Sequence, residues 1–526
     1  MGLSTRTQHM ALAAIIMSAS ILLSRFMGLI RDKVISWQFG ASGEADLYFA
    51  AFVVPDFINY LLAGGYVSIT LIPLLARRFE EDTDDAWRFF STVLCWALLV
   101  SAALTGAAFV CAPQLALLTA PGFDAAQQER LAAFLRIILP AQVFFLTGAC
   151  FSALLFLRRQ FFIPALTPLI YNGAIILGGL LLPLFAPVQG MEGFCWGVTA
   201  GAALGACILP WRAACKGVEG VRLAWSWRHP LMGRFLLIAL PLMLGQSIIM
   251  LNEQFLRIFG SLAGDGAVSL LSYARRISQV PVGIIGQAAA VASYPFLASL
   301  AAKNDMAGLS ATLHGAVRAS LLLALPLSAW LTAVAGPAMS LIFQGGVFGP
   351  AESAAATPLL QVMLVMTPFW VVQALVGRAF YALGDTRTPA IAGTVITLAS
   401  LPLFYASLRW GASGIAWVST LGTAVYTAAL LVIWQKRQNV RLLRPDARLY
   451  LTGTLLATAA GAASWLVSEY CLTLDIPRLA RIPLALATSG ACFTACYALG
   501  SRIMAPELVR ALLAPLLRRL RRRQEA

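Results

Sequence analysis

Long, nearly uninterrupted apolar runs recur along the whole of this 526-residue chain. Most are about 20 residues or longer, the length that an α-helix needs to cross the hydrocarbon core of a bilayer. Strands of a transmembrane barrel would instead alternate in polarity over about ten residues. Hydrophobic residues make up 60% of the chain and charged residues only 12%, too few to cover a water-soluble fold of this size. The pattern predicts an all-α polytopic membrane protein with fourteen transmembrane helices, near residues 10–36, 46–75, 89–111, 131–157, 162–186, 191–213, 234–258, 268–300, 309–335, 353–383, 388–409, 412–435, 448–470 and 482–504.

The distribution of Lys and Arg among the loops predicts the orientation. Most of the 38 basic residues lie in the N-terminal tail, in the loops after even-numbered spans and in the C-terminal tail. The loops after odd-numbered spans hold few, chiefly Arg130, Arg409, Arg478 and Arg481. Because basic loops stay on the cytoplasmic side, both termini are expected there. This bias also accounts for most of the formal net charge of +15, so no nucleic-acid partner is expected.

Short motifs recur along the chain at a nearly constant offset. The recurring positions are Pro55 and Pro281 (226 apart), Phe123 and Phe348 (225), Pro164 and Pro389 (225), and Trp196 and Trp417 (221). A period near 225 that covers six spans indicates two homologous six-helix lobes. Six is even, so both lobes insert in the same orientation, related by a pseudo-two-fold along the membrane normal. We expect an N-terminal lobe at 1–215, a C-terminal lobe at 216–440, two further spans at 441–505 and a basic cytoplasmic tail at 506–526 that contacts membrane lipids.

Sequence motifs for nucleotide or metal chemistry are missing. No G-x-x-x-x-G-K-[ST] phosphate loop occurs, and His9, His229 and His314 are not spaced as zinc ligands. No catalytic residue, metal or cofactor is therefore expected. The alternative from another class, a membrane-embedded enzyme of lipid-linked glycan metabolism, would need a metal-binding acidic cluster. The acidic run at 80–85 is interpreted instead as a solvated loop, so the chain is not expected to be an enzyme.

Charged residues within the spans gather in spans 1, 2, 7 and 8. Such residues are costly in a bilayer unless they face a cavity or a partner. Arg25 and Arg31 are six residues apart in span 1, about 120° around a helix, so both can face one broad cavity. The others are Asp46 and Asp56 in span 2, Glu253 and Arg257 in span 7, and Arg275 and Arg276 in span 8. We predict a net-positive cavity between the lobes that suits a diphosphate, because Arg offers a bidentate fork to phosphate oxygens.

Structural roles are the alternative for each of these side chains. An arginine can extend to the interface, or it can pair with Asp46 or Glu253. Arg136, Arg318 and Arg378 are assigned mainly to structure. Pro55, Pro140, Pro281 and Pro368 are expected to kink their spans. The segment Gly201–Gly205 is interpreted as a small-residue packing face.

Several motifs, in order along nearly the whole chain, resemble the MurJ (MviN) lipid II flippase family of the multidrug/oligosaccharidyl-lipid/polysaccharide exporter superfamily. They are Ser24-Arg25 with Arg31-Asp32, Ala45-Asp46 with Tyr48-Phe49-Ala50-Ala51-Phe52, Ala120-Pro121-Gly122-Phe123, Arg159-Gln160-Phe161-Phe162-Ile163-Pro164-Ala165, Ala274-Arg275-Arg276 with Pro281, and Phe380-Tyr381 with Asp385-Thr386 and Thr388-Pro389. The resemblance implies a bacterial inner-membrane flippase that moves a lipid-linked peptidoglycan precursor to the periplasmic leaflet by alternating access. Its last two spans would form a groove for the polyprenyl tail. A monomer is expected.

The resemblance also implies substrate-binding residues. Arg25, Arg31 and Arg276 match the family's cavity arginines, and Asp46 matches its span 2 aspartate. Three positions depart from the pattern: Asn59 and Gly64 replace an arginine and a glutamate, and Arg275 replaces an aspartate. Arg275 would restore the missing positive charge, so it is added to the predicted site. The alternative within transport is a flippase for another polyprenyl-diphosphate glycan, such as an O-antigen or exopolysaccharide unit.

Overall fold

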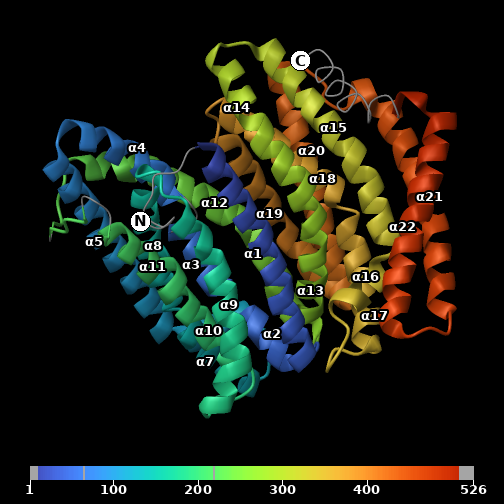
Figure 1. Cartoon of the computed structure of the whole chain (residues 1–526), viewed down its shortest axis with the longest axis horizontal. Coiled ribbons are helices and arrows are strands. Elements are labelled where there is room, and N and C mark those ends of the chain that lie inside the picture. Colours follow the sequence, from blue (N-terminus) through green and yellow to red (C-terminus); the bar gives the residue numbers. More distant parts are fainter. Residues whose placement is uncertain (1–9, 63–65, 217–219, 225, 509–526) are drawn as a thin grey trace. The chain divides into compact units, whose positions relative to one another are not determined.

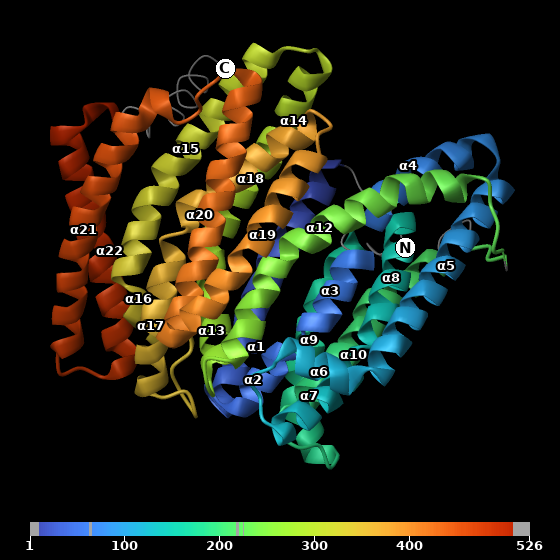
Figure 2. The same ribbon diagram turned by 180° about the vertical axis from the view of Figure 1, so that it is seen from behind.

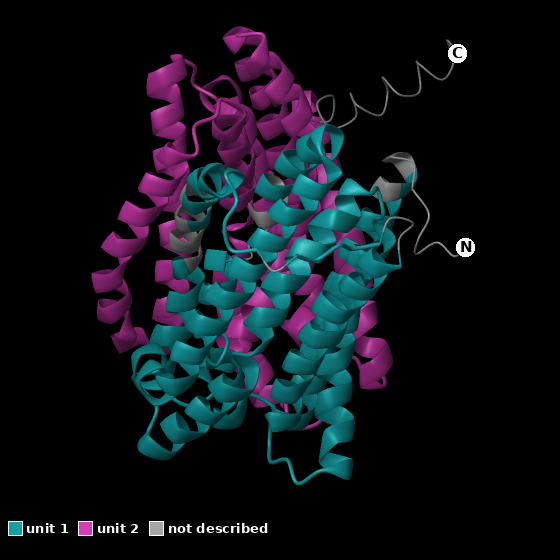
Figure 3. Ribbon diagram, turned by 90° about the vertical axis from the view of Figure 1, so that its left-hand side faces the viewer, with its two compact units in different colours: residues 1–269 teal, residues 270–526 magenta. Residues whose placement is uncertain are grey.

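The computed structural model describes residues 10–62, 66–216, 220–224 and 226–508. Gly64 therefore lies outside the described residues, as does the tail beyond 508. Contacts between Cα atoms divide the chain into two compact units, Met1–Ser269 and Leu270–Ala526, coloured teal and magenta in Figure 3. The regular structure of the described residues is helical throughout.

Unit 1 is built on long helices broken by short ones. Helix α9 packs on α1 and α10, α8 packs on α4 and α5, and α12 packs on α3 and α4. The helices are α1 (Met10–Phe39), α2 (Gly43–Ala50), α3 (Val53–Leu62), α4 (Tyr66–Glu81), α5 (Thr83–Val110), α6 (Ala112–Thr119), α7 (Ala125–Ile138), α8 (Ala141–Leu157), α9 (Phe162–Phe185), α10 (Glu192–Gly201), the π-helical η1 (Ala202–Ile208), α11 (Leu209–Cys215) and α12 (Leu231–Ser261).

Unit 2 contains the remaining helices, the first of which starts just before the boundary. Helices α21 and α22 run side by side in both ribbon views (Figures 1 and 2), and α15 packs on α18 and α21. The elements are α13 (Ala267–Pro281), the π-helical η2 (Val282–Gln287), α14 (Ala288–Ala302), α15 (Met306–Ala333), α16 (Ala335–Ile342), α17 (Pro350–Leu364), α18 (Thr367–Ala382), α19 (Arg387–Ser407), η3 (Leu408–Trp410), α20 (Gly411–Gln438), η4 (Arg444–Asp446), α21 (Ala447–Thr473) and α22 (Arg478–Met504).

Each of the fourteen predicted spans coincides with one helix or with consecutive helices. By length and hydropathy, the described residues contain ten helical segments able to cross a membrane, or eleven if the bent pair α17 and α18 is one span. One of the ten, Arg387–Gln438, runs through both α19 and α20. The chain is therefore an all-helical multi-pass membrane protein, and the structure is consistent with fourteen spans.

The four prolines expected to kink spans each lie at or near a helix break. Pro55 follows the break between α2 and α3, Pro140 lies between α7 and α8, and Pro281 is followed by π-helical η2. Pro368 lies in the first turn of α18, which is bent by 41° from α17. The helices break at these positions because proline has no N–H, which removes one helical hydrogen bond, and because its ring clashes with the preceding turn.

The predicted packing face at Gly201–Gly205 is confirmed. A Cβ atom at Gly201 would lie 3.0 Å from the Cβ of Ala174 on α9, and one at Gly205 would lie 3.0 Å from Cγ2 of Ile170. Just before them, a Cβ atom at Gly197 would lie 2.6 Å from the carbonyl oxygen of Ala174. Small residues allow α10 and η1 to approach α9 closely, which is how helices gain packing contacts in a bilayer.

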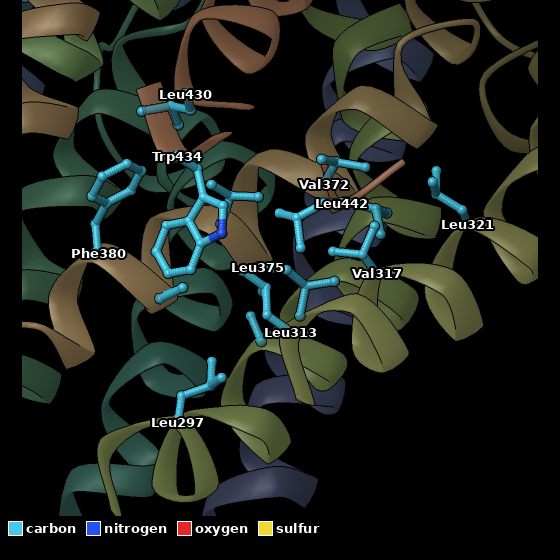
Figure 4. Close-up of a cluster of buried hydrophobic side chains, with 14 of the residues drawn as sticks. Leu297, Leu313, Val317, Leu321, Val372, Leu375, Phe380, Leu430, Trp434 and Leu442 are labelled. Carbon is cyan, nitrogen blue, oxygen red and sulfur yellow. The ribbon is translucent and has the colours of Figure 1, made fainter. Parts of the chain in front are cut away.

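The core of unit 2 is centred on α15, α18 and α20. Trp434 and Phe380 meet edge to face with ring centroids 5.3 Å apart, and Leu313 and Leu375 lie in the same buried cluster (Figure 4). The apolar residues of α18 in this cluster, Val372, Leu375, Val376 and Ala379, follow the i, i+3, i+4, i+7 spacing of one helix face. This packing holds α18 in place, and α18 carries a residue of the candidate site.

The compact units do not divide the chain where the repeat does. Helix α12, the seventh predicted span, belongs to unit 1 because unit 1 extends to Ser269. The boundary predicted at residue 215 comes from sequence symmetry, which is a different property. The two-lobe repeat with its pseudo-two-fold stays a prediction.

Candidate functional site

Arg31 of α1 is held by two side chains of unit 1. Its Nη2 lies 2.8 Å from Oδ1 of Asp32, and its Nη1 donates to Oδ1 of Asn172 on α9 at 3.2 Å. Asn172 Nδ2 in turn donates to the carbonyl oxygen of Pro168 at 2.9 Å, which turns the amide oxygen towards Arg31. The side chains of Arg31 and Asp32 are only 12% and 2% exposed. A charge removed from water in this way is tolerated because it is paired and hydrogen-bonded.

Arg25 lies on the same helix, but its surroundings differ. Its side chain is exposed, whereas that of Arg31 contacts α9. Both belong to unit 1, and the predicted partners Arg275 and Arg276 belong to unit 2. A cavity shared by all four stays a prediction.

Asp46 is buried completely, at 0% exposure, on α2. Its two carboxylate oxygens accept the backbone N–H groups of Gly266 and Ser269, each at 2.7 Å. Gly266 has φ +80°, and a Cβ there would lie 2.5 Å from the carbonyl oxygen of Ala41. A carboxylate at the first turn of a helix satisfies N–H groups that have no partner within the helix. This geometry suits a positioning role, because both oxygens hold backbone N–H groups and no part of the side chain is exposed to a substrate.

Two further charges of the predicted set neutralise each other. Arg257 on α12 lies 2.8 Å from Oδ2 of Asp56 on α3, and its Nη1 also donates to Gln254 at 3.1 Å. Both residues belong to the charged set predicted from the sequence, but their pairing was not predicted. Helix packing between α3 and α12 joins residues 201 positions apart, which no local spacing indicates.

In unit 2, Arg275 lies over an aromatic ring. Its guanidinium carbon is 4.2 Å from the centroid of Trp370 on α18, within the range of a cation–π contact. Trp370 Nε1 donates to Oγ1 of Thr423 on α20 at 3.1 Å. Arg276 is half-buried and lies about 100° further around α13, so it projects in another direction.

The arginines assigned to structure have structural contacts. Nε of Arg318 on α15 lies 3.3 Å from Oδ1 of Asp446, and Nε2 of His314 lies 3.0 Å from the other carboxylate oxygen, Oδ2. Arg378 lies over the ring of Tyr294, and Arg136 over that of Phe109.

The acidic run is occupied by capping and ion pairs. Asp82 accepts the N–H groups of Asp84 and Asp85 at the start of α5. Arg77 donates to Glu81, which lowers the pKa of that carboxyl below its usual value. In the part of the chain that the structure describes, no three His, Cys, Asp or Glu side chains gather as a metal site requires. The run therefore has a structural explanation.

Sequence reasoning missed Asn172 and Trp370. Asn172 gives a weak signal, since an amide within the apolar run 162–185 needs a polar partner. Trp370 gives none, because tryptophan is common in apolar spans.

The family model of "Lipid II flippase MurJ" matches residues 35–482 of the chain. The chain belongs to the MurJ lipid II flippase family. It is 28% identical over 504 residues to a probable lipid II flippase MurJ of Vibrio cholerae, covering 89% of this chain and 94% of that protein. It is likewise 28% identical over 442 residues to the lipid II flippase MurJ of Burkholderia cenocepacia, covering 81% and 84%.

Solved structures support the fold. A lipid II flippase MurJ in an inward closed conformation superposes with a TM-score of 0.77 at 22% identity, covering 94% of this chain and 100% of that one. An inward-facing multidrug resistance MATE family transporter of the MOP superfamily gives 0.67 at 15% identity, covering 82% and 99%. The membership of the MurJ family that the sequence motifs predict is confirmed by the family model, and the solved structures confirm the fold.

Proposed function

We propose that this chain translocates lipid II, a polyprenyl-diphosphate-linked muropeptide, from the cytoplasmic to the periplasmic leaflet by alternating access, in support of peptidoglycan synthesis and cell shape. The observation that carries the proposal is the match of the family model over residues 35–482. Relatives that match over most of their length are named lipid II flippases, which favours lipid II over an O-antigen or exopolysaccharide unit.

The diphosphate is the part of the substrate that the candidate site suits. It carries about two negative charges, which cannot leave water cheaply unless cations are already in place. Arg31 is held rigid by Asp32 and Asn172, and a guanidinium has five N–H donors, more than these contacts use. Arg25, Arg275 and Arg276 supply further positive charge, and Asp46 holds the first turn of α13. Transport on this account makes and breaks no covalent bond, so the chain acts as a transporter and not as an enzyme.

The proposal includes a location and an organisation. The chain lies in the bacterial inner membrane with both termini in the cytoplasm, as the loop charges favour. It acts as a monomer whose two six-helix lobes, 1–215 and 216–440, alternate access to the substrate. Residues 441–505, which contain α21 and α22, receive the polyprenyl tail.

Complementation tests the proposal. The chain is expressed in a bacterium whose own lipid II flippase is under conditional control, and growth is followed after depletion. We expect the wild-type chain to restore growth, and an empty vector not to. Failure to restore growth at normal abundance in the membrane would contradict the proposal.

A further inference from the structure

We propose that Trp370 is a positioning residue for substrate binding, which holds the guanidinium of Arg275 through its ring face and is itself oriented by Thr423. This inference rests on the proposed function, because it assigns Arg275 to the binding of the diphosphate. It adds a role for a side chain that neither the sequence motifs nor the predicted site includes.

The first step is the contact between Arg275 and Trp370. At 4.2 Å from the ring centroid, the guanidinium carbon lies well within the roughly 6 Å at which the indole face attracts a cation. Both side chains are half-buried, so the attraction is less screened than at an open surface. An aromatic face restrains a guanidinium without neutralising its charge.

The second step is the orientation of the indole. Trp370 Nε1 donates to Oγ1 of Thr423 on α20, and Thr423 Oγ1 donates in turn to the carbonyl oxygen of Ser419 at 3.1 Å. Thr423 is buried, at 6% exposure. The indole plane is therefore fixed by a chain of two hydrogen bonds that ends on the backbone of α20.

The third step is the close approach between α18, which carries Trp370, and η2, which directly continues α13, the helix of Arg275. After Pro281 the helix continues as π-helical η2, in which Gly286 faces α18. A Cβ atom at Gly286 would lie 3.4 Å from Cα of Val371, the residue after Trp370. π-Helical segments within helices occur often at functional sites. Here the π-helical segment and its glycine bring the continuation of α13 against α18, at the turn that carries Trp370.

A double-mutant cycle tests the assignment. The protein is reconstituted in nanodiscs of neutral phospholipid, and the affinity for undecaprenyl diphosphate is measured for wild type, Trp370→Leu, Arg275→Ala and the double variant. We expect Trp370→Leu to weaken binding roughly three- to tenfold. In the Arg275→Ala background the same change should weaken binding less than about twofold, because the guanidinium that Trp370 positions is gone.

Two conservative variants and one control accompany the cycle. Trp370→Phe keeps a ring face and should recover binding to within about threefold of wild type. Thr423→Val removes the hydroxyl that accepts from the indole and donates to Ser419, and it should weaken binding by a smaller factor than Trp370→Leu. Trp417→Leu, on the exposed face of the same α20, should leave the affinity unchanged.

The outcomes separate the two proposals. If Trp370→Leu weakens binding equally with and without Arg275, Trp370 does not act through Arg275 and the assignment is overturned. The assignment is also overturned if Trp370→Phe and Thr423→Val both bind as weakly as Trp370→Leu. Unchanged binding in a folded Trp370→Leu variant overturns it as well. A wild-type chain that does not bind undecaprenyl diphosphate overturns the proposed function and this inference with it.

Discussion

The side-chain oxygen of Asn172 lies 3.2 Å from Nη1 of Arg31 and joins α9 to the charged half of α1. Asp32 completes the arrangement from the next position of α1. One carboxylate and one neutral amide therefore hold the guanidinium, and the amide restrains it without adding a second negative charge. The arrangement suits an arginine that must keep its attraction for an anionic substrate.

Exchanging Asn172 tests this point. Asn172→Asp would place a second carboxylate beside Arg31, which should weaken the affinity for undecaprenyl diphosphate more than Asn172→Ala does. We expect a loss of about tenfold for Asp and about threefold for Ala, measured in nanodiscs. Equal losses would show that the hydrogen bond matters and the charge does not. A gain on introducing Asp would contradict an anionic ligand at Arg31.

Removal of the predicted substrate arginines should abolish transport. Arg25→Ala, Arg276→Ala and Arg31→Ala are each expected to fail in the complementation assay, and Lys should rescue only in part because it lacks the bidentate fork. Since Arg31→Ala would remove the arginine that faces the buried carboxylate of Asp32, it is combined with Asp32→Asn to keep the protein abundant. Arg318→Ala is the control and should support growth, because His314 still pairs with Asp446. Normal growth of all three Ala variants would rule out the arginine mechanism.

Replacing Asp46 should lower the stability of the folded protein more than its affinity for undecaprenyl diphosphate. Asp46→Ala leaves two buried N–H groups without their acceptor, which costs about 1–3 kcal/mol for each group. We expect a lower melting temperature in detergent, and a smaller drop for Asp46→Asn, which keeps one acceptor oxygen. The folded Asp46→Asn protein should still bind undecaprenyl diphosphate within about threefold of wild type. Loss of binding at an unchanged melting temperature would instead assign Asp46 to the substrate.

The orientation is tested with reporter fusions. A reporter joined after Arg441, in the segment between α20 and α21, and another after Arg518 should both report a cytoplasmic location, because basic loops remain on that side. A third fusion after Arg409, between α19 and α20, should report the periplasm. A periplasmic signal at Arg441 or Arg518 would refute the predicted topology.

The spacing of apolar and small residues was enough to predict where the helices lie and one of their packing faces. Each predicted span falls on one helix or on consecutive helices, which is consistent with fourteen spans. Gly201 and Gly205 form the predicted packing face, because small residues at this spacing allow close helix packing. The pairing of Arg257 with Asp56 could not be predicted, since it depends on which helices become neighbours. The contact between Arg275 and Trp370 could not be predicted either, because nothing in the local sequence distinguishes Trp370 from an exposed tryptophan such as Trp417.

Another contact that depends on helix neighbours lies before α19. Arg437, from the end of α20, pairs with Asp385, whose side chain also accepts the N–H of Thr388 at 2.9 Å. Burial acts to raise the pKa of Asp385, but the hydrogen bonds from Thr388 and Arg437 outweigh it and lower the pKa below the ordinary 3.8. The carboxylate thus stabilises the fold above pH 3.8, and this contribution is lost as the pH falls further.

The central claim is that this chain moves lipid II. Its most direct test is depletion of the chain in its native host, followed by quantification of the lipid-linked precursors that accumulate and of the leaflet that holds them. The account predicts that lipid II accumulates in the cytoplasmic leaflet and that re-expression of the wild-type chain, but not of the Arg31→Ala/Asp32→Asn variant, clears it. Accumulation of a different polyprenyl-diphosphate glycan, with lipid II unchanged in amount and location, would contradict the account.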